Sequence, residues 1–124
     1  MEKIRVLLAD DHPMVRRGIR NLLEQESDIH VIGEASNGRE ALQMVEDLAP
    51  DIVLLDIQMP DLTGIEVARQ LHTARSAVRI LALSAYADRQ YALRMLANGA
   101  AGYLTKEEAP KTIVQAIRGI YRGE

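Results

Sequence analysis

Residues 51–66 read DIVLLDIQMPDLTGIE, and this stretch contains one complete strand-to-helix unit. The run Asp51–Leu55 is mainly apolar and β-branched, as expected of a strand that is covered on both faces. Asp56 follows the run and leads into a loop that contains proline. Thr63 and Glu66 then have the spacing of a capping box at the start of a helix. The stretch therefore predicts a buried strand that delivers an acidic side chain to a loop.

The same unit recurs along the chain. Further short apolar runs, expected to be strands, are Ile4–Ala9, His30–Glu34, Arg79–Leu83 and Gly102–Leu104. Between the strands, apolar residues recur with the period of a helix. These stripes are Val15, Ile19, Leu22 and Leu23; Leu42, Val45 and Leu48; Ile65, Ala68 and Leu71; Ala92, Met95 and Leu96; and Ile113, Ala116, Ile117 and Ile120.

Residues that favour helix ends agree with this division. Asn37 and Glu40 have capping-box spacing before the second helix. Asp88 can cap the fourth helix and Gly99 can end it, while Pro110 suits the first turn of the last helix. The local signals and the apolar pattern therefore predict the same boundaries.

Five β-α units without an antiparallel hairpin signal predict an α/β domain with a doubly wound, five-stranded parallel sheet and five helices. For five strands the leading strand order is the flavodoxin-like 2-1-3-4-5, in which ligands bind beyond the carboxyl ends of the strands. No linker, low-complexity stretch or repeat interrupts the pattern. We therefore expect residues 1–124 to form one domain.

Composition excludes several function classes. A net charge of −3 does not favour the phosphate attraction that nucleic-acid binders use. The absence of cysteine removes disulfides and thiolate chemistry. The apolar run after Arg5 stops at Asp10, too early for a signal peptide or a membrane span. We expect a cytoplasmic, soluble protein that contacts neither membrane nor nucleic acid directly.

Polar residues follow four of the five expected strands. Asp10 and Asp11 follow the first strand, and Asp56 follows the third. Ser84 follows the fourth strand, and Lys106 lies just past the fifth. These four strands are consecutive in the expected order, so their carboxyl ends meet at one edge of the sheet. We expect the five side chains to share one cleft.

That set of groups favours one kind of chemistry. Carboxylates in one cleft repel each other, and a pair about 4 Å apart costs on the order of 4 kcal/mol at an effective dielectric of 20. Oxygen ligands select a hard cation such as Mg²⁺. Lys106 adds an ammonium and Ser84 a hydroxyl donor. Together with a nucleophilic carboxylate, these are the parts needed for in-line phosphoryl transfer to an aspartate.

The three histidines fit this chemistry less well. His12 follows the acidic pair and could be read as a metal ligand or a phosphate carrier. Oxygen-ligated Mg²⁺ needs no imidazole, so the favoured interpretation is a residue at the start of the first helix. His30 and His72 have no acidic or histidine neighbours at metal-binding spacing.

At these residues the sequence resembles the receiver domains of bacterial two-component response regulators. The matching stretches are LLADDHPMVRRG (7–18), DIVLLDIQMPDLTGIE (51–66), ILALSAY (80–86) and NGAAGYLTKE (98–107). With the closing AIRGIYRGE, they look most like the NarL/FixJ subfamily. The resemblance covers essentially the whole chain and implies a CheY-like version of the flavodoxin-like fold.

The resemblance also implies roles for the acidic residues. Asp56 would be the phosphoacceptor and would receive its phosphoryl group from a sensor histidine kinase. Mg²⁺ would be the cofactor, with Asp10, Asp11, Asp56 and the backbone carbonyl of Gln58 around it.

Other positions would respond to the phosphoryl group. Ser84 and Lys106 would contact its oxygens, and Tyr103 occupies the aromatic switch position. Pro60 and Gly64 would shape the loop after the phosphoacceptor. The switch would change the face formed by helix 4, strand 5 and helix 5. Glu107 stands where many members have a proline with a cis bond, which leaves the isomer of the preceding bond open.

Three partnerships follow from the resemblance. We expect a sensor kinase as phosphodonor and a homodimer on phosphorylation, through helices 1 and 5 or through the helix 4, strand 5 and helix 5 face. We also expect a C-terminal helix-turn-helix domain, outside this chain, that would contact DNA and make the whole protein a transcriptional regulator. We expect no enzymatic activity other than catalysis by the domain of its own phosphorylation and dephosphorylation.

Three alternatives remain at this point. A stand-alone receiver would lack the output domain. A receiver that works without phosphorylation is disfavoured by the intact set of acids, Ser84 and Lys106. An aspartyl-phosphate hydrolase generally has a second aspartate two residues after the nucleophile, and that position is Gln58 here.

Overall fold

The computed structural model describes residues 3–85 and 89–123, and these form five alternating strands and helices. The strands are β1 (Ile4–Ala9), β2 (Ile29–Ala35), β3 (Ile52–Asp56), β4 (Arg79–Ser84) and β5 (Gly102–Thr105). The helices are α1 (Pro13–Glu24), α2 (Gly38–Leu48), α3 (Gly64–Thr73), α4 (Arg89–Ala97) and α5 (Ala109–Tyr121). Each strand and helix expected from the sequence is present.

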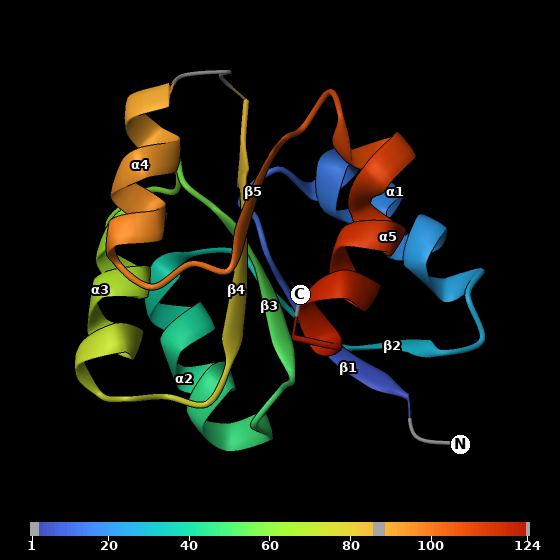
Figure 1. Ribbon diagram of the computed structural model, residues 1–124, viewed down its shortest axis with the longest axis horizontal. Coiled ribbons are helices and arrows are strands. Elements are labelled where there is room, and N and C mark those ends of the chain that lie inside the picture. The colour runs from blue at the N-terminus through green and yellow to red at the C-terminus, as the bar shows by residue number, and fades with distance from the viewer. Residues whose placement is uncertain (1–2, 86–88, 124) are drawn as a thin grey trace.

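The strands form one parallel sheet in the order β2-β1-β3-β4-β5. Helices α1 and α5 cover one face of the sheet, and α2, α3 and α4 cover the other (Figure 1). The predicted doubly wound, flavodoxin-like fold is therefore confirmed. Because all strands are parallel, their carboxyl ends lie along the same edge of the sheet, as the site prediction requires.

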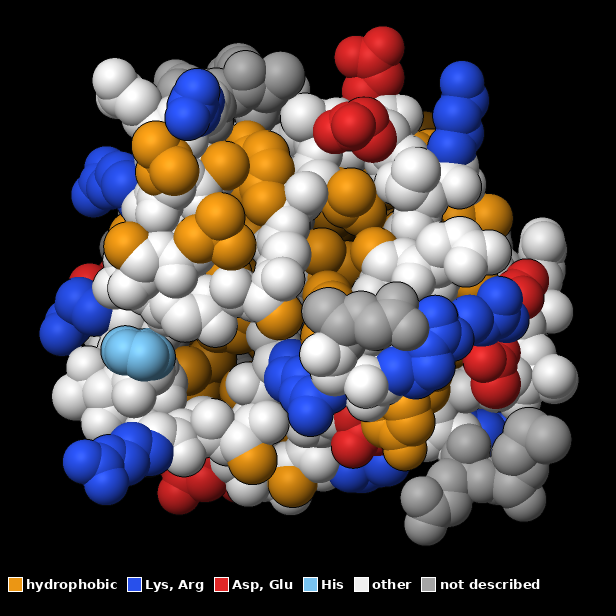
Figure 2. All heavy atoms as spheres, in the orientation of Figure 1, with side chains coloured by type: hydrophobic (Ala, Val, Ile, Leu, Met, Phe, Trp, Pro, Cys, Tyr) orange, Lys and Arg blue, Asp and Glu red, His pale blue; other side chains and the backbone are white. Residues whose placement is uncertain are grey.

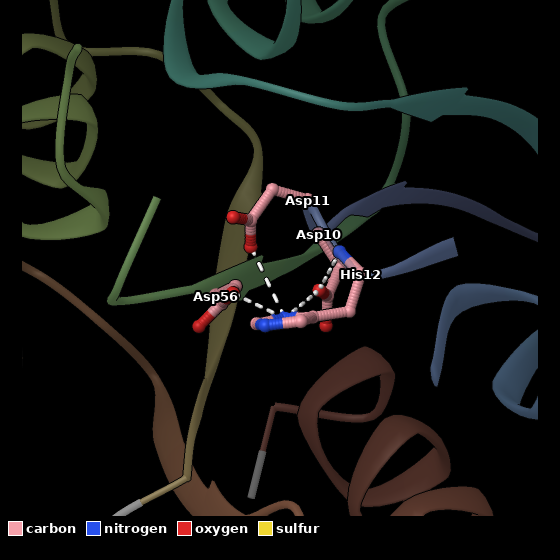
Figure 3. A group of neighbouring side chains, drawn as sticks. All are labelled: Asp10, Asp11, His12 and Asp56. Carbon is pink, nitrogen blue, oxygen red and sulfur yellow. Dashed lines mark hydrogen bonds and ion pairs between the residues drawn. The ribbon is translucent and has the colours of Figure 1, made fainter. Parts of the chain in front are cut away.

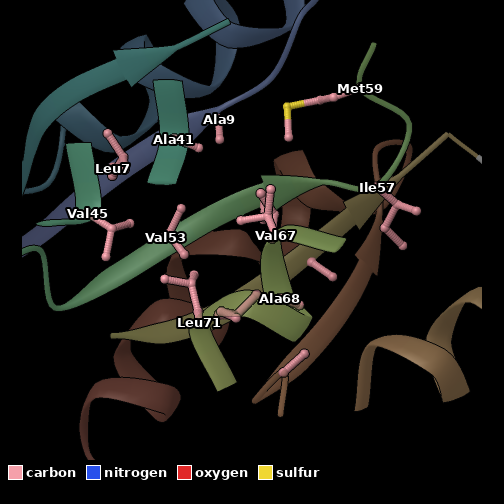
Figure 4. Packing of buried hydrophobic residues seen from close by; sticks show 14 of the residues in the cluster. Leu7, Ala9, Ala41, Val45, Val53, Ile57, Met59, Val67, Ala68 and Leu71 are labelled. Carbon is pink, nitrogen blue, oxygen red and sulfur yellow. The ribbon is translucent and has the colours of Figure 1, made fainter. Parts of the chain in front are cut away.

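Two apolar cores hold the strands in place. Alternate residues of a strand face opposite sides of the sheet, so β3 contributes Val53 to one core and Leu54 to the other. The core beneath α2, α3 and α4 includes Val53 and Leu71, which are both labelled in Figure 4. All five residues of β3 are buried. The last of them, Asp56, is thus fixed at the centre of the sheet by the packing of the strand.

The helix ends follow the expected signals. The Asn37 side chain accepts a hydrogen bond from the backbone N–H of Glu40 at 2.8 Å, and the Thr63 hydroxyl accepts one from Glu66 at 3.3 Å. Pro110 lies in the first turn of α5. The predicted cap Asp88 lies outside the described residues.

The structure corrects the sequence analysis at two points. Asp56 and Ser84 are the last residues of β3 and β4 rather than the first residues after them, because each still pairs with the neighbouring strand. Leu96, placed in the apolar stripe of the fourth helix, is 49% exposed, whereas the adjacent Met95 is fully buried. A short helix packed on one side buries only a narrow stripe.

No helix in residues 3–85 and 89–123 combines the length and the apolar character that a membrane span requires.

Candidate functional site

The expected acidic residues converge at the carboxyl edge of the sheet. Asp10 and Asp11 follow β1, His12 precedes α1, and Asp56 ends β3. Figure 3 shows these four side chains pointing toward one another across the sheet edge. Each offers one ligand atom, and all four atoms lie within 4.8 Å of one another. We call this group the acidic cluster.

Burial makes the cluster unusual. Among the described residues, the buried polar or charged ones are Asp10, Asp56 and Ser84, and these are 2%, 0% and 0% exposed. Removing a carboxylate from water is costly unless a charge or hydrogen bonds compensate. All three residues lie at this one edge, so the molecule places its least favourable buried groups together.

Among the described residues, Lys106 supplies the positive charge nearest to the buried carboxylates. It follows β5, and its Nζ lies 3.2 Å from Asp56 Oδ2 and 3.1 Å from Asp10 Oδ2. Burial lowers the pKa of this ammonium, but the neighbouring Asp56 and Asp10 charges outweigh burial, so the lysine pKa is raised. Lys106 therefore stays charged and faces the cluster, as expected from the sequence.

One ammonium does not neutralise the cluster. Burial, followed by repulsion from Asp10, raises the pKa of Asp56 from 3.8 to about 6, against the lowering effect of Lys106. The direction follows from desolvation and like charge, both of which disfavour a second buried carboxylate. An additional cation would remove this repulsion.

The cluster fits such a cation. The buried atoms Asp10 Oδ2 and Asp11 Oδ1 accept no hydrogen bond of good geometry from the described residues, although Lys106 Nζ lies 3.1 Å from the first and His12 Nδ1 lies 3.2 Å from the second. Two other oxygens are oriented by backbone N–H groups, Asp10 Oδ1 by that of His12 at 2.8 Å and Asp56 Oδ1 by that of Gln58 at 3.1 Å. Fixed carboxylate oxygens with free lone pairs are suitable ligands for a hard divalent ion.

The remaining predicted residues lie on the neighbouring strands and in the loop after Asp56. The Ser84 hydroxyl, at the end of β4, donates to Gln58 Oε1 at 3.3 Å, which ties β4 to the loop after Asp56. Tyr103 lies on β5, partly buried against the core beneath α2, α3 and α4 and outside the acidic cluster. Pro60 is exposed in the loop.

Gly64 closely approaches the backbone of Asp56 and Ile57. A Cβ at this position would collide with the carbonyl oxygen of Asp56 and lie 2.8 Å from Ile57 Cα. The backbone N–H of Gly64 donates to the carbonyl of Ile57 at 3.0 Å, which closes the loop. The loop-shaping role expected of this glycine is therefore consistent with its contacts.

The structure adds a residue that sequence reasoning set aside. His12 is the N-cap residue at the start of α1, as favoured, but its Nδ1 also lies 3.2 Å from both Asp10 Oδ1 and Asp11 Oδ1. The available signal was its position directly after the acidic pair. The bond from Lys106 to Glu107 is trans, since the described residues contain no cis peptide.

Comparison with known proteins gives a consistent family. The family described as "Response regulator receiver domain" matches residues 6–118. The chain is 41% identical to the response regulator UvrY of Escherichia coli K12 over 121 residues, which cover 98% of this chain and 56% of that protein. It is 37% identical to the E. coli nitrate/nitrite response regulator protein NarL, over 99% of this chain and 57% of that protein.

A solved structure agrees with these relatives. The receiver domain of the putative response regulator NarL from Mycobacterium tuberculosis has a TM-score of 0.95 and 35% identity, and the match covers 100% of both chains. The chain thus spans a little over half the length of the curated relatives and the whole of this isolated domain.

Proposed function

The chain belongs to the response regulator receiver domain family, and on that premise we propose that it is a phosphorylation-controlled switch whose phosphoacceptor is Asp56. A sensor histidine kinase would supply the phosphoryl group from a phosphohistidine. The observation that carries the proposal is the convergence of Asp10, Asp11, Asp56 and Lys106 on one buried edge.

The proposed reaction is a single transfer. A carboxylate oxygen of Asp56 forms a bond to phosphorus while the bond from phosphorus to the donor nitrogen breaks, and the donor imidazole leaves. Lys106 would stabilise the charge on the transferred oxygens, and the Ser84 hydroxyl would donate a hydrogen bond to one of them. Mg²⁺, held by Asp10, Asp11, Asp56 and the Gln58 carbonyl, would neutralise phosphoryl charge when bound.

We assign no independent substrate to this site. Gln58 stands two residues after Asp56, and its side-chain amide has no proton to give to a leaving group at ordinary pH. Its Oε1 is also engaged by Ser84 at 3.3 Å. The domain would therefore catalyse only its own phosphorylation and dephosphorylation, in the cytoplasm where sensor kinases present their phosphohistidine.

The phosphorylated state would be read on the face formed by α4, β5 and α5. Leu93 and Leu96 of α4 are 53% and 49% exposed, and Figure 2 shows hydrophobic side chains over α4 and in the hollow between β5 and α5. Phosphorylation adds about two negative charges beside Ser84 and Lys106, which can shift a two-state loop. We propose homodimerisation through this face.

The whole protein would be a transcriptional regulator. One relative, 38% identical over 99% of this chain, is described as a transcriptional regulatory protein of Bacillus subtilis. This chain covers 56% of that relative. A helix-turn-helix domain on the C-terminal side would make the DNA contacts, and the receiver would control it.

Intact-mass measurement tests the phosphoacceptor. After incubation with acetyl phosphate and MgCl₂, wild type should gain one phosphoryl group, and Asp56→Asn should gain none. Asp61→Asn is the matched control, because Asp61 is exposed in the same loop and its positive φ of 65° suits asparagine. Equal labelling of the Asp56 variant and wild type would overturn the proposal.

A further inference from the structure

Asp10 lies just beyond the paired part of the sheet. The paired residues of β1 end at Ala9. Asp10 follows one residue later, whereas Asp56 still pairs with Leu83 of β4. The Asp10 side chain is nevertheless buried, and its Oδ2 lies 3.1 Å from the Lys106 ammonium. Contacts outside the strand ladder must therefore hold the backbone that carries this acid.

Two other elements supply these contacts. The backbone N–H of Asp10 donates to the carbonyl of Ala35, the last residue of β2, at 3.0 Å. The carbonyl of Asp10 accepts a hydrogen bond at 2.7 Å from Nη1 of Arg16, which lies on α1. Both backbone polar groups of Asp10 are thus engaged, and one of them depends on a side chain.

Arg16 is itself held by Glu34 of β2. Its Nε donates to Glu34 Oε1 at 2.9 Å, and both side chains are largely shielded from solvent. Burial raises the pKa of Glu34, but hydrogen bonds from Arg20 and Arg16 outweigh burial, so the pKa is lowered and the carboxylate stays charged. A planar guanidinium can donate to Glu34 and to the Asp10 carbonyl from fixed positions. These contacts connect the edge strand β2 to the acidic cluster.

We propose that Arg16 is a positioning residue for the phosphoryl transfer and acts through the backbone of Asp10. This inference rests on the proposed function, because Asp10 takes part in the reaction only through the proposed cation site. Without Arg16, the Asp10 carbonyl loses its donor, and the peptide that leads to Asp11 can change its orientation. Both acids would then lose their alignment with Asp56 while the sheet remains folded. Small displacements of orienting groups reduce reaction rates by large factors.

Arg20 provides a matched control because it shares a partner with Arg16. It lies one turn further along α1, and its guanidinium donates to the other oxygen of Glu34 and, at 2.8 Å, to Glu24. Within the described residues these bonds do not reach Asp10. A purely structural role for the ion pairs between α1 and β2 predicts similar effects of removing either arginine. A positioning role predicts that removing Arg16 alone impairs the reaction.

Phosphorylation of the 124-residue chain by acetyl phosphate tests the proposal in wild type, Arg16→Met and Arg20→Met. Intact-mass measurement gives the rate constant over a range of MgCl₂ concentrations, at a temperature where far-UV circular dichroism shows every variant to be folded. Arg16→Met should need at least about tenfold more MgCl₂ for half of its maximal rate, because outer partners of metal ligands affect affinity 10–100-fold. Arg20→Met should stay within about twofold of wild type.

Arg16→Lys is a second variant at the same position. It keeps the positive charge but lacks the planar fork, so its requirement for MgCl₂ should rise in the same direction by a smaller factor. If Arg16→Met does not fold, the comparison with Arg20→Met is made with this variant.

Hydrogen exchange provides a readout without metal. The N–H of His12 donates to Asp10 Oδ1 at 2.8 Å, so its exchange reports how firmly the Asp10 side chain is held. In EDTA, NMR should show that this amide exchanges at least about tenfold faster in Arg16→Met than in wild type. In Arg20→Met the exchange should stay within about twofold of wild type.

The possible outcomes separate this inference from the proposed function. If either the MgCl₂ requirement or the His12 exchange were unchanged in Arg16→Met, the inference would be overturned and the proposed function would stand. Equal changes in Arg16→Met and Arg20→Met would also overturn it, since the ion pairs would then act only on the fold. If wild type were not labelled at any MgCl₂ concentration, the proposed function would fail, and the inference with it.

Discussion

The two ends of the sheet differ in the polar groups that they bring together. At the amino end, the Arg5 guanidinium donates hydrogen bonds to the carbonyls of Ala49 and Leu48, at the end of α2, at 2.6 and 2.7 Å. Arg79 donates in the same manner to the carbonyls of Ile120 and Tyr121 at the end of α5. At the carboxyl end, Asp10 and Asp56 are buried side by side with one ammonium between them.

The contrast separates charges that stabilise the fold from charges that would serve the proposed phosphoryl transfer. Arginines that cap helix ends meet groups of opposite polarity and satisfy otherwise unpaired carbonyls. The carboxyl end instead concentrates like charges, and the raised pKa of Asp56 reflects the cost. Groups held in unfavourable surroundings are a frequent feature of functional sites. Four substitutions test this account of the two ends. For each one, the free energy of unfolding is measured by urea unfolding followed by far-UV circular dichroism.

The largest effect is expected from Gly64→Ala. The added methyl group meets the backbone of Asp56 and Ile57, which cannot give way as a flexible side chain would. We expect a loss of about 3 kcal/mol in the free energy of unfolding. Gly18→Ala, inside α1, is the control. A methyl group there would meet no atom within 4 Å beyond its own stretch of helix, so this change should stabilise by about 0.5–1 kcal/mol. Equal effects at both glycines would contradict the close approach.

Asp56→Asn should stabilise the metal-free protein in a pH-dependent way. The folded-state pKa of about 6 exceeds the ordinary value of 3.8, so the folded protein binds more protons between these values. The contribution of Asp56 to the free energy of unfolding is fully present below pH 4 and is lost as the pH rises through 6. In EDTA at pH 8, the variant should gain about 2–3 kcal/mol over wild type, and the gain should vanish near pH 4. A gain independent of pH would contradict the electrostatic cause.

Lys106→Met should destabilise the metal-free protein by about 2 kcal/mol at pH 8, because the variant leaves Asp10 and Asp56 without their ammonium. In saturating MgCl₂ the loss should be smaller, since the proposed ion would compensate the same carboxylates. The comparison is made between EDTA and MgCl₂ at matched ionic strength. A loss that is identical in both conditions would show that the lysine does not share its role with a cation.

Arg5→Ala provides the smallest expected loss, about 1 kcal/mol, from two hydrogen bonds to carbonyls at the end of α2. Because Arg5 lies at the amino end, the loss should be the same in EDTA and in MgCl₂. A Mg²⁺-dependent loss here would remove the distinction between the two ends of the sheet.

The carboxyl end was largely predictable from sequence because strand order determines which strand ends are neighbours. Once β1, β3, β4 and β5 were recognised, Asp10, Asp56, Ser84 and Lys106 had to share an edge. The helix cap at Asn37 was equally predictable, because capping depends on local sequence spacing.

Other features depend on three-dimensional packing that no local pattern records. The His12 ring lies near Asp10, which follows β1, and near Asp56, which ends β3 and is far away in the sequence. The exposure of Leu96 depends on which side of α4 meets the sheet. The close approach of Gly64 to Asp56 depends on the path of the loop between them. Sequence spacing identifies such residues as candidates, and the fold decides their contacts.

The most direct test of the central claim is the effect of Mg²⁺ on stability. The free energy of unfolding of wild type is measured at pH 8 in EDTA, in MgCl₂ and in NaCl of the same ionic strength. If a divalent ion relieves the repulsion among the acids, MgCl₂ at ten times its Kd should add about 1.4 kcal/mol that NaCl does not, and Asp10→Asn should reduce this gain. Equal stability of wild type in MgCl₂ and NaCl would contradict the account.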